Sequence, residues 1–323
     1  MELKDILIAR QNIAHLVRRT PLQHSGALSK RVASDVWLKL ENLQLTGAFK
    51  VRGAVNRIAS LSAEERARGV VAPSSGNFAL GVAYAAHVLG GVSVNLFMPI
   101  STPVTKIDKL AEFEAEISLV GETYDDASDA SKEFQREYGL TYTDSLDDLL
   151  VIAGQGTVGL EIMEELPDAD AILVPIGGGG LIAGVSVAAK AMNPEIKIIG
   201  VQVEASPSAY LSLKEGRCYE RYDHDPTICE GLAGGFGIVP FEIAKDLIDE
   251  VILVNEEETR EAILALLEAE QLVVEGSGAV GVAALLFDKV GLKGKKVVAV
   301  ISGGNIDIGL LAEILAGRLQ RGA

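Results

Sequence analysis

The stretch LTGAFKVRGA, residues 45–54, follows a strand-like apolar run at residues 36–40. Thr46 is suited to cap a helix, and apolar residues recur at helical spacing as far as residue 59, so we predict a helix over 46–60. Lys50 then lies in its first turn, where the helix dipole disfavours a cation. Burial there would also lower the lysine pKa and free the amine as a nucleophile. The alternative is a surface lysine on an amphipathic helix.

The composition limits the function classes. The chain has 323 residues, 48% of them hydrophobic, and a net charge of 29 − 45 = −16. An acidic chain repels phosphate backbones and anionic lipids, so we expect no nucleic-acid or membrane partner. Two uncharged stretches, 70–105 and 171–189, are interrupted by proline and glycine, which argues against membrane spans.

Cysteine usage and the first residues bear on the compartment. Cys218 and Cys229 lack metal-ligand spacing and are expected to be reduced thiols. The first residues lack the basic-then-apolar pattern of a signal peptide. We therefore expect a cytoplasmic protein.

The order of elements predicts an α/β fold with parallel sheets. Residues 62–68 are polar and are expected to link two lobes. The smaller lobe should comprise residues 69–146, and the larger one residues 1–68 and 147–323, with a ligand in the cleft between them. Strands are expected at 36–40, 70–72, 92–98, 116–120, 171–175, 196–203, 251–254 and 297–301, and helices at 1–20, 46–60, 78–89, 104–113, 124–138, 157–166, 181–192, 259–270 and 273–287.

Four glycines, Gly177, Gly178, Gly179 and Gly180, separate one such strand from a helix. Without side chains, their successive amides can turn toward one anion at the helix N-terminus, and a phosphate is the obvious ligand. A flexible hinge is the alternative. The pattern is not that of a nucleotide-hydrolysing P-loop. A second glycine pattern at 276–281 lacks the strand-then-helix context of a dinucleotide site.

Two further strand ends carry hydroxyl groups. Ser74-Ser75-Gly76-Asn77 opens a helix, where its amides could hold a carboxylate and either hydroxyl could transfer a proton. For Ser74 a helix cap is an equal alternative. Ser302 ends the last strand and is suited to meet a neutral ring nitrogen or to cap the next helix. Glu275 lies in an apolar run, so we expect an ion pair or a role in a site.

Other chemistries find little support. The four histidines form no metalloprotease motif, and no serine-hydrolase motif occurs. The acidic pairs 125–126 and 147–148 are expected to be solvated faces or helix caps.

A glycine loop suited to a phosphate, a lysine at a helix start and a serine at a strand end together indicate an aldehyde cofactor that carries a phosphate. Pyridoxal 5'-phosphate fits all three. The segments 46–54, 74–77, 177–180 and 302–305 in this order resemble the serine/threonine dehydratase and serine racemase family. That family belongs to the tryptophan-synthase-β group, also called fold-type II pyridoxal-phosphate enzymes. The resemblance covers nearly the whole chain and implies a two-lobed homodimer.

The resemblance also implies roles for individual residues. Lys50 would form the Schiff base and, when freed, remove the Cα proton. Ser75 would lie across the ring from it as a second acid. The remaining implied roles are ring packing by Phe49, a bond from Asn77 to the phenolic oxygen, phosphate binding by Gly177, Gly178, Gly179 and Gly180, a bond between Ser302 and the pyridine nitrogen, and a substrate carboxylate pocket lined by Ser75, Gly76, Asn77 and Phe78.

Several positions depart from the family pattern. Ala48 replaces a usual serine, and Phe78 replaces a usual histidine, which makes the substrate side more apolar. Glu204 matches the first residue of the family's cation site, but Tyr210 occupies the position of the second acid. We therefore predict no metal.

The first hypothesis is a dehydratase, or ammonia-lyase, that converts L-threonine or L-serine into a 2-oxo acid and ammonia. The alternatives are an amino-acid racemase that uses Ser75, or a dehydratase of a bulkier or acidic β-hydroxy amino acid such as phenylserine or 3-hydroxyaspartate. A non-catalytic sensing module on the same fold is a third hypothesis.

Overall fold

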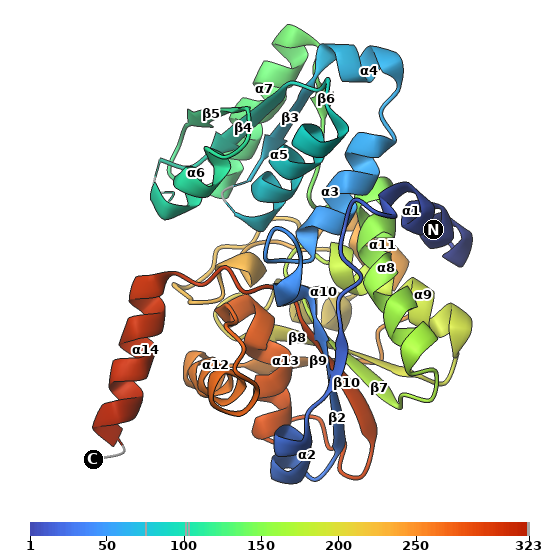
Figure 1. Cartoon of the computed structure of the whole chain (residues 1–323), viewed down its shortest axis with the longest axis vertical. Coiled ribbons are helices and arrows are strands. Elements are labelled where there is room, and N and C mark those ends of the chain that lie inside the picture. The colour runs from blue at the N-terminus through green and yellow to red at the C-terminus, as the bar shows by residue number, and fades with distance from the viewer. Residues whose placement is uncertain (75, 101, 103, 322–323) are drawn as a thin grey trace.

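The computed structural model describes residues 1–74, 76–100, 102 and 104–321. Its strands form one sheet of six strands and one of four, both flanked by helices (Figure 1). Both sheets are predominantly parallel, as β–α alternation requires. The predicted α/β class with parallel-sheet cores is confirmed.

The larger sheet has helices on both faces. Alternate residues of a strand point to opposite faces: Leu173 packs toward α12 and α13, whereas Ile172 and Val174 pack toward α8 and α9. Strand β1 is antiparallel to β2, and all other neighbours are parallel. Across the sheet the order is β1 (Leu22–His24), β2 (Asp35–Leu40), β10 (Lys296–Ile301), β7 (Ala171–Pro175), β8 (Lys197–Val203) and β9 (Glu250–Val254).

The smaller sheet is formed by residues 70–142 and is wholly parallel. Val70 and Leu96 pack toward α5, whereas Val71 and Phe97 pack toward α7 on the other face. The strand order is β5 (Ala115–Leu119), β4 (Val94–Met98), β3 (Val70–Pro73) and β6 (Thr141–Tyr142).

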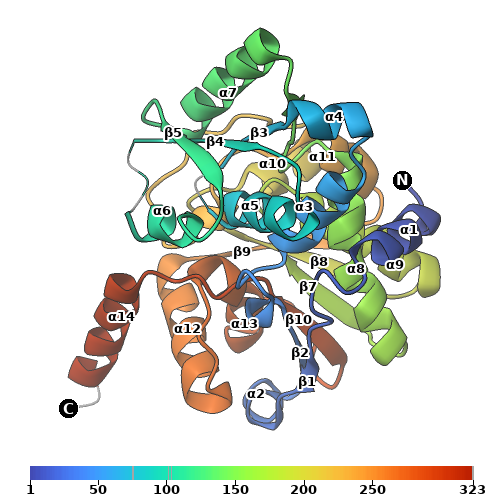
Figure 2. The same ribbon diagram turned by 45° about the horizontal axis from the view of Figure 1, so that its top comes forward.

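The helices connect and cover these strands (Figures 1 and 2). They are α1 (Leu3–Ile13), α2 (Gly26–Val32), α3 (Lys50–Ala59), α4 (Ala63–Arg68), α5 (Asn77–Leu89), α6 (Val104–Leu110), α7 (Tyr124–Tyr138), α8 (Leu149–Glu165), α9 (Gly180–Met192), α10 (Ser208–Glu215), α11 (Ile238–Ala244), α12 (Glu256–Glu270), α13 (Gly276–Leu286) and α14 (Ile308–Arg321), with 3₁₀ turns η1 (Glu41–Leu43) and η2 (Glu230–Leu232).

Helix α3 lies between the two sheets (Figure 1). Its residues Val51, Val55 and Ile58 share a core with Phe78 and Val82 of α5. The helix therefore carries Lys50 while packing against the smaller sheet. The lobe boundaries at residues 69 and 146 stay a prediction.

Glycines bring α3, α8 and α9 unusually close together. A Cβ atom at Gly154 would lie 2.5 Å from the carbonyl oxygen of Arg52, and one at Gly184 would lie 2.6 Å from the backbone nitrogen of Gly156. Only glycine permits such contacts between helix backbones. Helix α8 thereby fixes the lysine helix relative to the helix that follows the four glycines.

A buried ion-pair network supports the same helix. Arg52 is fully buried and donates two hydrogen bonds of 2.8 Å to Glu41 and bonds of 2.6 and 2.9 Å to Glu161. Lys39, also fully buried, donates to Glu161 at 2.6 Å. Each buried charge thus has an opposite partner, which is the condition for stable burial.

Several sequence predictions of element bounds were wrong. Helix α3 begins at Lys50 and not at 46, because Gly47 has φ +75° and the loop before Lys50 pairs with residues 302–304. Residues 62–68 are expected only to be a polar link, and within them α4 forms because Ser62 and Glu65 make a capping box. Helix α1 ends at Ile13, and α8 already begins at Leu149, where Asp148 caps it.

Helix α14 projects from the body beside α12 and ends at Arg321 (Figure 2). Ile314 is buried against the body, whereas Ile308 and Leu319 are exposed. No helix within the described residues is long and apolar enough to cross a bilayer.

Candidate cofactor and active site

Three of the four predicted loops follow neighbouring strands. β2, β10 and β7 are adjacent and parallel, so the loops after them lie along one edge of the larger sheet. These loops lead to Lys50, contain Ser302 and contain the four glycines, respectively. The topology thereby gathers groups that are far apart in the sequence.

The lysine loop and the loop after β10 are joined through their backbones. The N–H of Phe49 donates to the carbonyl of Ser302 at 3.0 Å, and the N–H of Gly304 donates to the carbonyl of Gly47 at 2.9 Å. The Ser302 hydroxyl is buried and donates to the carbonyl of Ser277 at 3.3 Å. These bonds hold the start of α3 beside the end of β10.

Lys50 is the first residue of α3, so it lies in the first turn as the sequence predicts. Its Nζ lies 5.3 Å from the centre of the Phe49 ring and 5.9 Å from that of Phe78. Burial lowers the pKa of Lys50 to about 8, although the negative charge of Asp144 acts in the opposite direction. About a tenth of the amine is therefore uncharged at pH 7, far more than for a lysine of ordinary pKa.

The four glycines form a loop packed on one side. A Cβ atom at Gly178 would lie 1.9 Å from Leu146, one at Gly179 would lie 2.0 Å from Phe236, and one at Gly177 would lie 2.4 Å from the carbonyl oxygen of Gly231. Gly179 also has φ +92°, a conformation that L side chains rarely adopt. Glycine is thus required here for packing and for the turn.

The amides of this loop are available to a ligand. Among the described residues, no group accepts a hydrogen bond from the N–H of Gly177, Gly178 or Gly179. They precede the N-terminus of α9, where an anion is favoured. The loop therefore fits a phosphate group, and the free lysine amine at the same sheet edge fits the aldehyde of pyridoxal phosphate.

Asn77 connects the smaller sheet to this edge. It begins α5 and donates to Glu275 Oε1 at 2.8 Å, while its own Oδ1 accepts a bond of 2.8 Å from Asn305. Asn305 also donates to the carbonyl of Thr46 at 2.9 Å, and Lys109 of α6 donates to Asn305 at 3.1 Å. Glu275, for which the sequence predicts an ion pair or a role in a site, therefore bonds the predicted site residue Asn77.

The serine loop is only partly described. The Ser74 hydroxyl accepts bonds from the N–H groups of Gly76 at 3.3 Å and Ala79 at 3.1 Å, so it satisfies donors at the start of α5, although Gly76 and not Ser74 is the N-cap residue. Gly76 precedes α5 and Phe78 is buried within it. Ser75 lies outside the described residues.

The sequence reasoning missed three residues around the glycine loop. Asp144 influences the Lys50 amine, and Leu146 covers Gly178. Gln155 lies beside Gly180 on α8. A polar glutamine between glycines in the mostly apolar run 151–160 is a signal that the sequence does contain.

Other candidate sites do not gain support. The glycine pattern at 276–281 begins α13 after a loop, so it is not a dinucleotide turn. Glu204 is exposed, and no cluster of three acidic, histidine or cysteine side chains suited to a metal occurs within the described residues.

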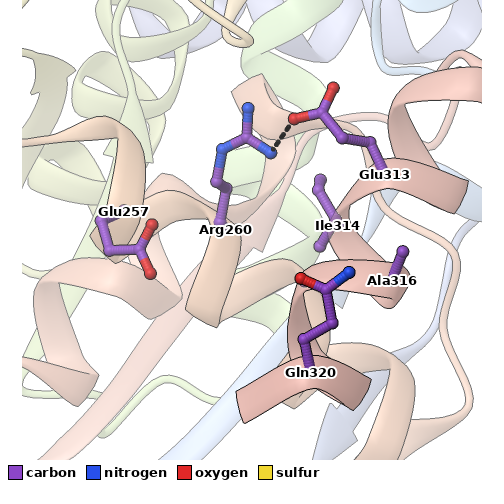
Figure 3. A pocket seen from close by; sticks show the side chains of 7 residues that line it. Glu257, Arg260, Glu313, Ile314, Ala316 and Gln320 are labelled. Carbon is purple, nitrogen blue, oxygen red and sulfur yellow. Dashed lines mark ion pairs between the residues drawn. The ribbon is translucent and has the colours of Figure 1, made fainter.

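A pocket away from the sheet edge lies between α12 and α14 (Figure 3). Arg260 pairs with Glu313 across it at 2.9 Å, and Ile314 and Gln320 contribute to its wall. None of the predicted cofactor residues lines it.

The sequence matches the family described as pyridoxal-phosphate dependent enzyme over residues 13–303. It is 50% identical to an L-threonine ammonia-lyase of Thermotoga maritima over 97% of this chain and 78% of that protein. It is 40% identical to the catabolic L-threonine dehydratase TdcB of Escherichia coli over 96% and 94%. The fold matches maize serine racemase with a TM-score of 0.90 at 34% identity, covering 99% and 98% of the two chains.

Proposed function

Because the chain belongs to the pyridoxal-phosphate dependent enzyme family, we propose that it is an L-threonine ammonia-lyase that also accepts L-serine. L-Threonine would yield 2-oxobutanoate and ammonia, since the water lost by elimination is regained when the product nitrogen is hydrolysed. The single observation that carries the proposal is the desolvated Lys50 amine, at the sheet edge that also holds an unpaired glycine nest. The relatives named as L-threonine ammonia-lyase and L-threonine dehydratase support the choice of substrate.

We assign the cofactor contacts residue by residue. The amides of Gly177, Gly178, Gly179 and Gly180 would hold the phosphate. Phe49, the residue before Lys50, would pack on the ring. Asn77, held by Glu275 and Asn305, would bind the phenolic oxygen, and Ser302 would be the neutral partner of the ring nitrogen.

Bound pyridoxal phosphate supplies an electron sink that stabilises negative charge at the substrate Cα. The protein's part is to move protons and exclude water. Lys50, with a pKa lowered to about 8, is suited to accept the Cα proton near neutral pH. Ser75, Gly76 and Asn77 would line the pocket for the substrate carboxylate at the start of α5.

Phe78 bears on both closure and specificity. Its ring lies 5.9 Å from the Lys50 amine but belongs to the helix that covers the smaller sheet. Movement of that sheet toward the larger one would therefore bring an apolar wall over the reacting groups and exclude water. An apolar wall also suits the methyl group of threonine better than a charged side chain.

The test is a 2-oxo acid assay over a panel of β-hydroxy amino acids, with absorbance spectra of the purified protein. We expect turnover with L-threonine, lower turnover with L-serine, and loss of both activities in Lys50→Ala. A protein without a visible cofactor band contradicts the proposal, as does an unimpaired Lys50→Ala variant. If the protein prefers phenylserine or 3-hydroxyaspartate, that amino acid replaces L-threonine as the assigned substrate.

Racemisation is a second candidate activity, favoured by the similarity to maize serine racemase. It needs a proton donor on the face opposite Lys50, and Ser75 is the residue that we assign to that role. Ser75→Ala should abolish formation of D-serine and spare much of the elimination. Chiral chromatography that finds no D-amino acid with the wild-type protein excludes this activity.

We also propose a cytoplasmic homodimer. Family resemblance supports the dimer, and the two unpaired cysteines, Cys218 and Cys229, are consistent with a reducing compartment. Light scattering coupled to gel filtration tests the mass, and a monomeric mass would reject the dimer. Fractionation of the source cells tests the compartment.

A further inference from the structure

Gln155 is a fully buried side chain without a hydrogen-bond partner. Its relative exposure is 0%, and neither Nε2 nor Oε1 has a partner among the described residues. A buried amide that forms no bond is costly, and in native structures such a group calls for an explanation. A ligand that is not part of the polypeptide is one such explanation.

The position of this side chain connects it to the cofactor site. Gln155 belongs to α8, and a Cβ atom at Gly180 would lie 2.5 Å from its acceptor Oε1 and 3.6 Å from its donor Nε2. A Cβ atom at Gly53, one turn after Lys50, would lie 3.2 Å from its Cγ. The amide therefore lies between the lysine helix and the first residue of α9.

The backbone of the glycine loop beside this side chain also has hydrogen-bond donors without acceptors. The N–H groups of Gly177, Gly178 and Gly179 have no acceptor among the described residues. Two independent features, an unpaired amide side chain and unpaired backbone donors, thus meet at the start of α9. One anionic group with several acceptor oxygens would accept hydrogen bonds from the Nε2–H of Gln155 and from these backbone donors.

We infer that Gln155 binds the phosphate group of the cofactor through its Nε2–H donor, together with the glycine nest. The inference rests on the proposed function, since it concerns the phosphate of pyridoxal phosphate. It adds a side-chain ligand from α8 to a site otherwise formed by backbone amides. Because Gln155 also contacts the lysine helix, phosphate binding would stabilise the arrangement of α3 and α9.

The test compares pyridoxal phosphate with pyridoxal, which lacks the phosphate. Both are titrated into the apoprotein of the wild type and of Gln155→Met, and binding is followed by absorbance. We expect Gln155→Met to weaken the binding of pyridoxal phosphate by about 10-fold or more, because one buried hydrogen bond to a charged group contributes about that much affinity. Pyridoxal should bind both proteins within about twofold, because the lost bond concerns only the phosphate.

Two further variants sharpen the result. Gln155→Glu should weaken the binding of pyridoxal phosphate more than Gln155→Met does, because a carboxylate repels the phosphate. Gln135→Met is the matched control, since Gln135 lies on α7 and its side-chain amide donates to the carbonyl of Leu140 at 3.2 Å. It should leave both affinities unchanged. The ³¹P shift of the bound cofactor should move in Gln155→Met and not in Gln135→Met.

Specific outcomes overturn the inference. Unchanged affinity for pyridoxal phosphate in Gln155→Met rejects it, and an equal loss for both ligands shows that Gln155 only supports the fold. A crystal structure with an ordered water between the amide and the phosphate rejects the direct bond. If the wild-type protein binds no pyridoxal phosphate, the proposed function itself fails.

Discussion

The backbone N–H of Phe49 donates to the carbonyl of Ser302 across 3.0 Å, which joins the residue before the lysine to the end of the last strand. The bond is possible because β2 and β10 are parallel neighbours throughout their length. Phe49, which we expect to pack on the cofactor ring, and Ser302, which we expect at the ring nitrogen, are therefore joined by one backbone hydrogen bond. Changes to the loop before Lys50 should therefore alter both.

Gly47→Ala tests this loop. Gly47 has φ +75°, and an added Cβ would lie 2.6 Å from Oδ1 of Asn305. We expect a loss of stability of about 1–2 kcal/mol from the backbone alone, and weaker cofactor binding because Asn305 would be displaced from Asn77. Urea unfolding and cofactor titration measure the two effects.

The matched control is Gly26→Ala in α2, where an added Cβ meets nothing within 4 Å. It should be neutral or stabilise the protein by up to about 1 kcal/mol, because alanine favours helix over glycine. Equal effects of the two substitutions would contradict the role of the Gly47 turn.

The rate at which apoprotein takes up pyridoxal phosphate should depend on pH through Lys50. Only the uncharged amine attacks the aldehyde, and burial lowers the pKa of Lys50 to about 8. The rate should therefore rise as the pH increases and level off above about 8, with about a quarter of the amine reactive at pH 7.5. Stopped-flow absorbance measures the profile.

Asp144→Asn tests whether the negative charge of Asp144 raises the pKa of Lys50. The carboxylate of Asp144 raises the pKa of Lys50, so its removal should lower that pKa further and move the midpoint of the profile to lower pH. A midpoint that stays in place or moves to higher pH would show that Asp144 does not act on the amine.

Arg52→Met should destabilise the protein strongly. It would leave Glu41 and Glu161 buried without their main partner, at a cost of about 3–5 kcal/mol in the free energy of unfolding. Arg217→Met removes an exposed ion pair with Glu215 and should leave that free energy nearly unchanged. Similar unfolding curves for the two variants would disprove the importance of the buried network.

Gly178→Ala should weaken cofactor binding, because its Cβ would lie 1.9 Å from the side chain of Leu146. Leu146→Ala removes that obstacle, so the double variant should bind the cofactor better than Gly178→Ala alone. Titration of the four proteins forms a double-mutant cycle. Strictly additive losses would show that Leu146 and Gly178 are not in contact.

Much of the fold could be predicted from local patterns. The strand at 171–175 and the helix at 124–138 have the bounds expected from their residues, because apolar runs and caps act over a few neighbours. The start of α3 could not be predicted in this way. Thr46 is a suitable cap locally, but the backbone bonds to residues 302–304 hold the loop in a turn that is not helical until Lys50.

The sequence by itself determined the chemistry available to this protein: a lysine at a helix start, a glycine run after a strand, and a serine at a strand end. Which of these groups meet was decided by the tertiary structure, since strand order places β2, β10 and β7 side by side. The unpaired state of Gln155 and the desolvation of Lys50 also arise only in the folded chain. Both depend on which distant groups exclude water, and no local spacing encodes that.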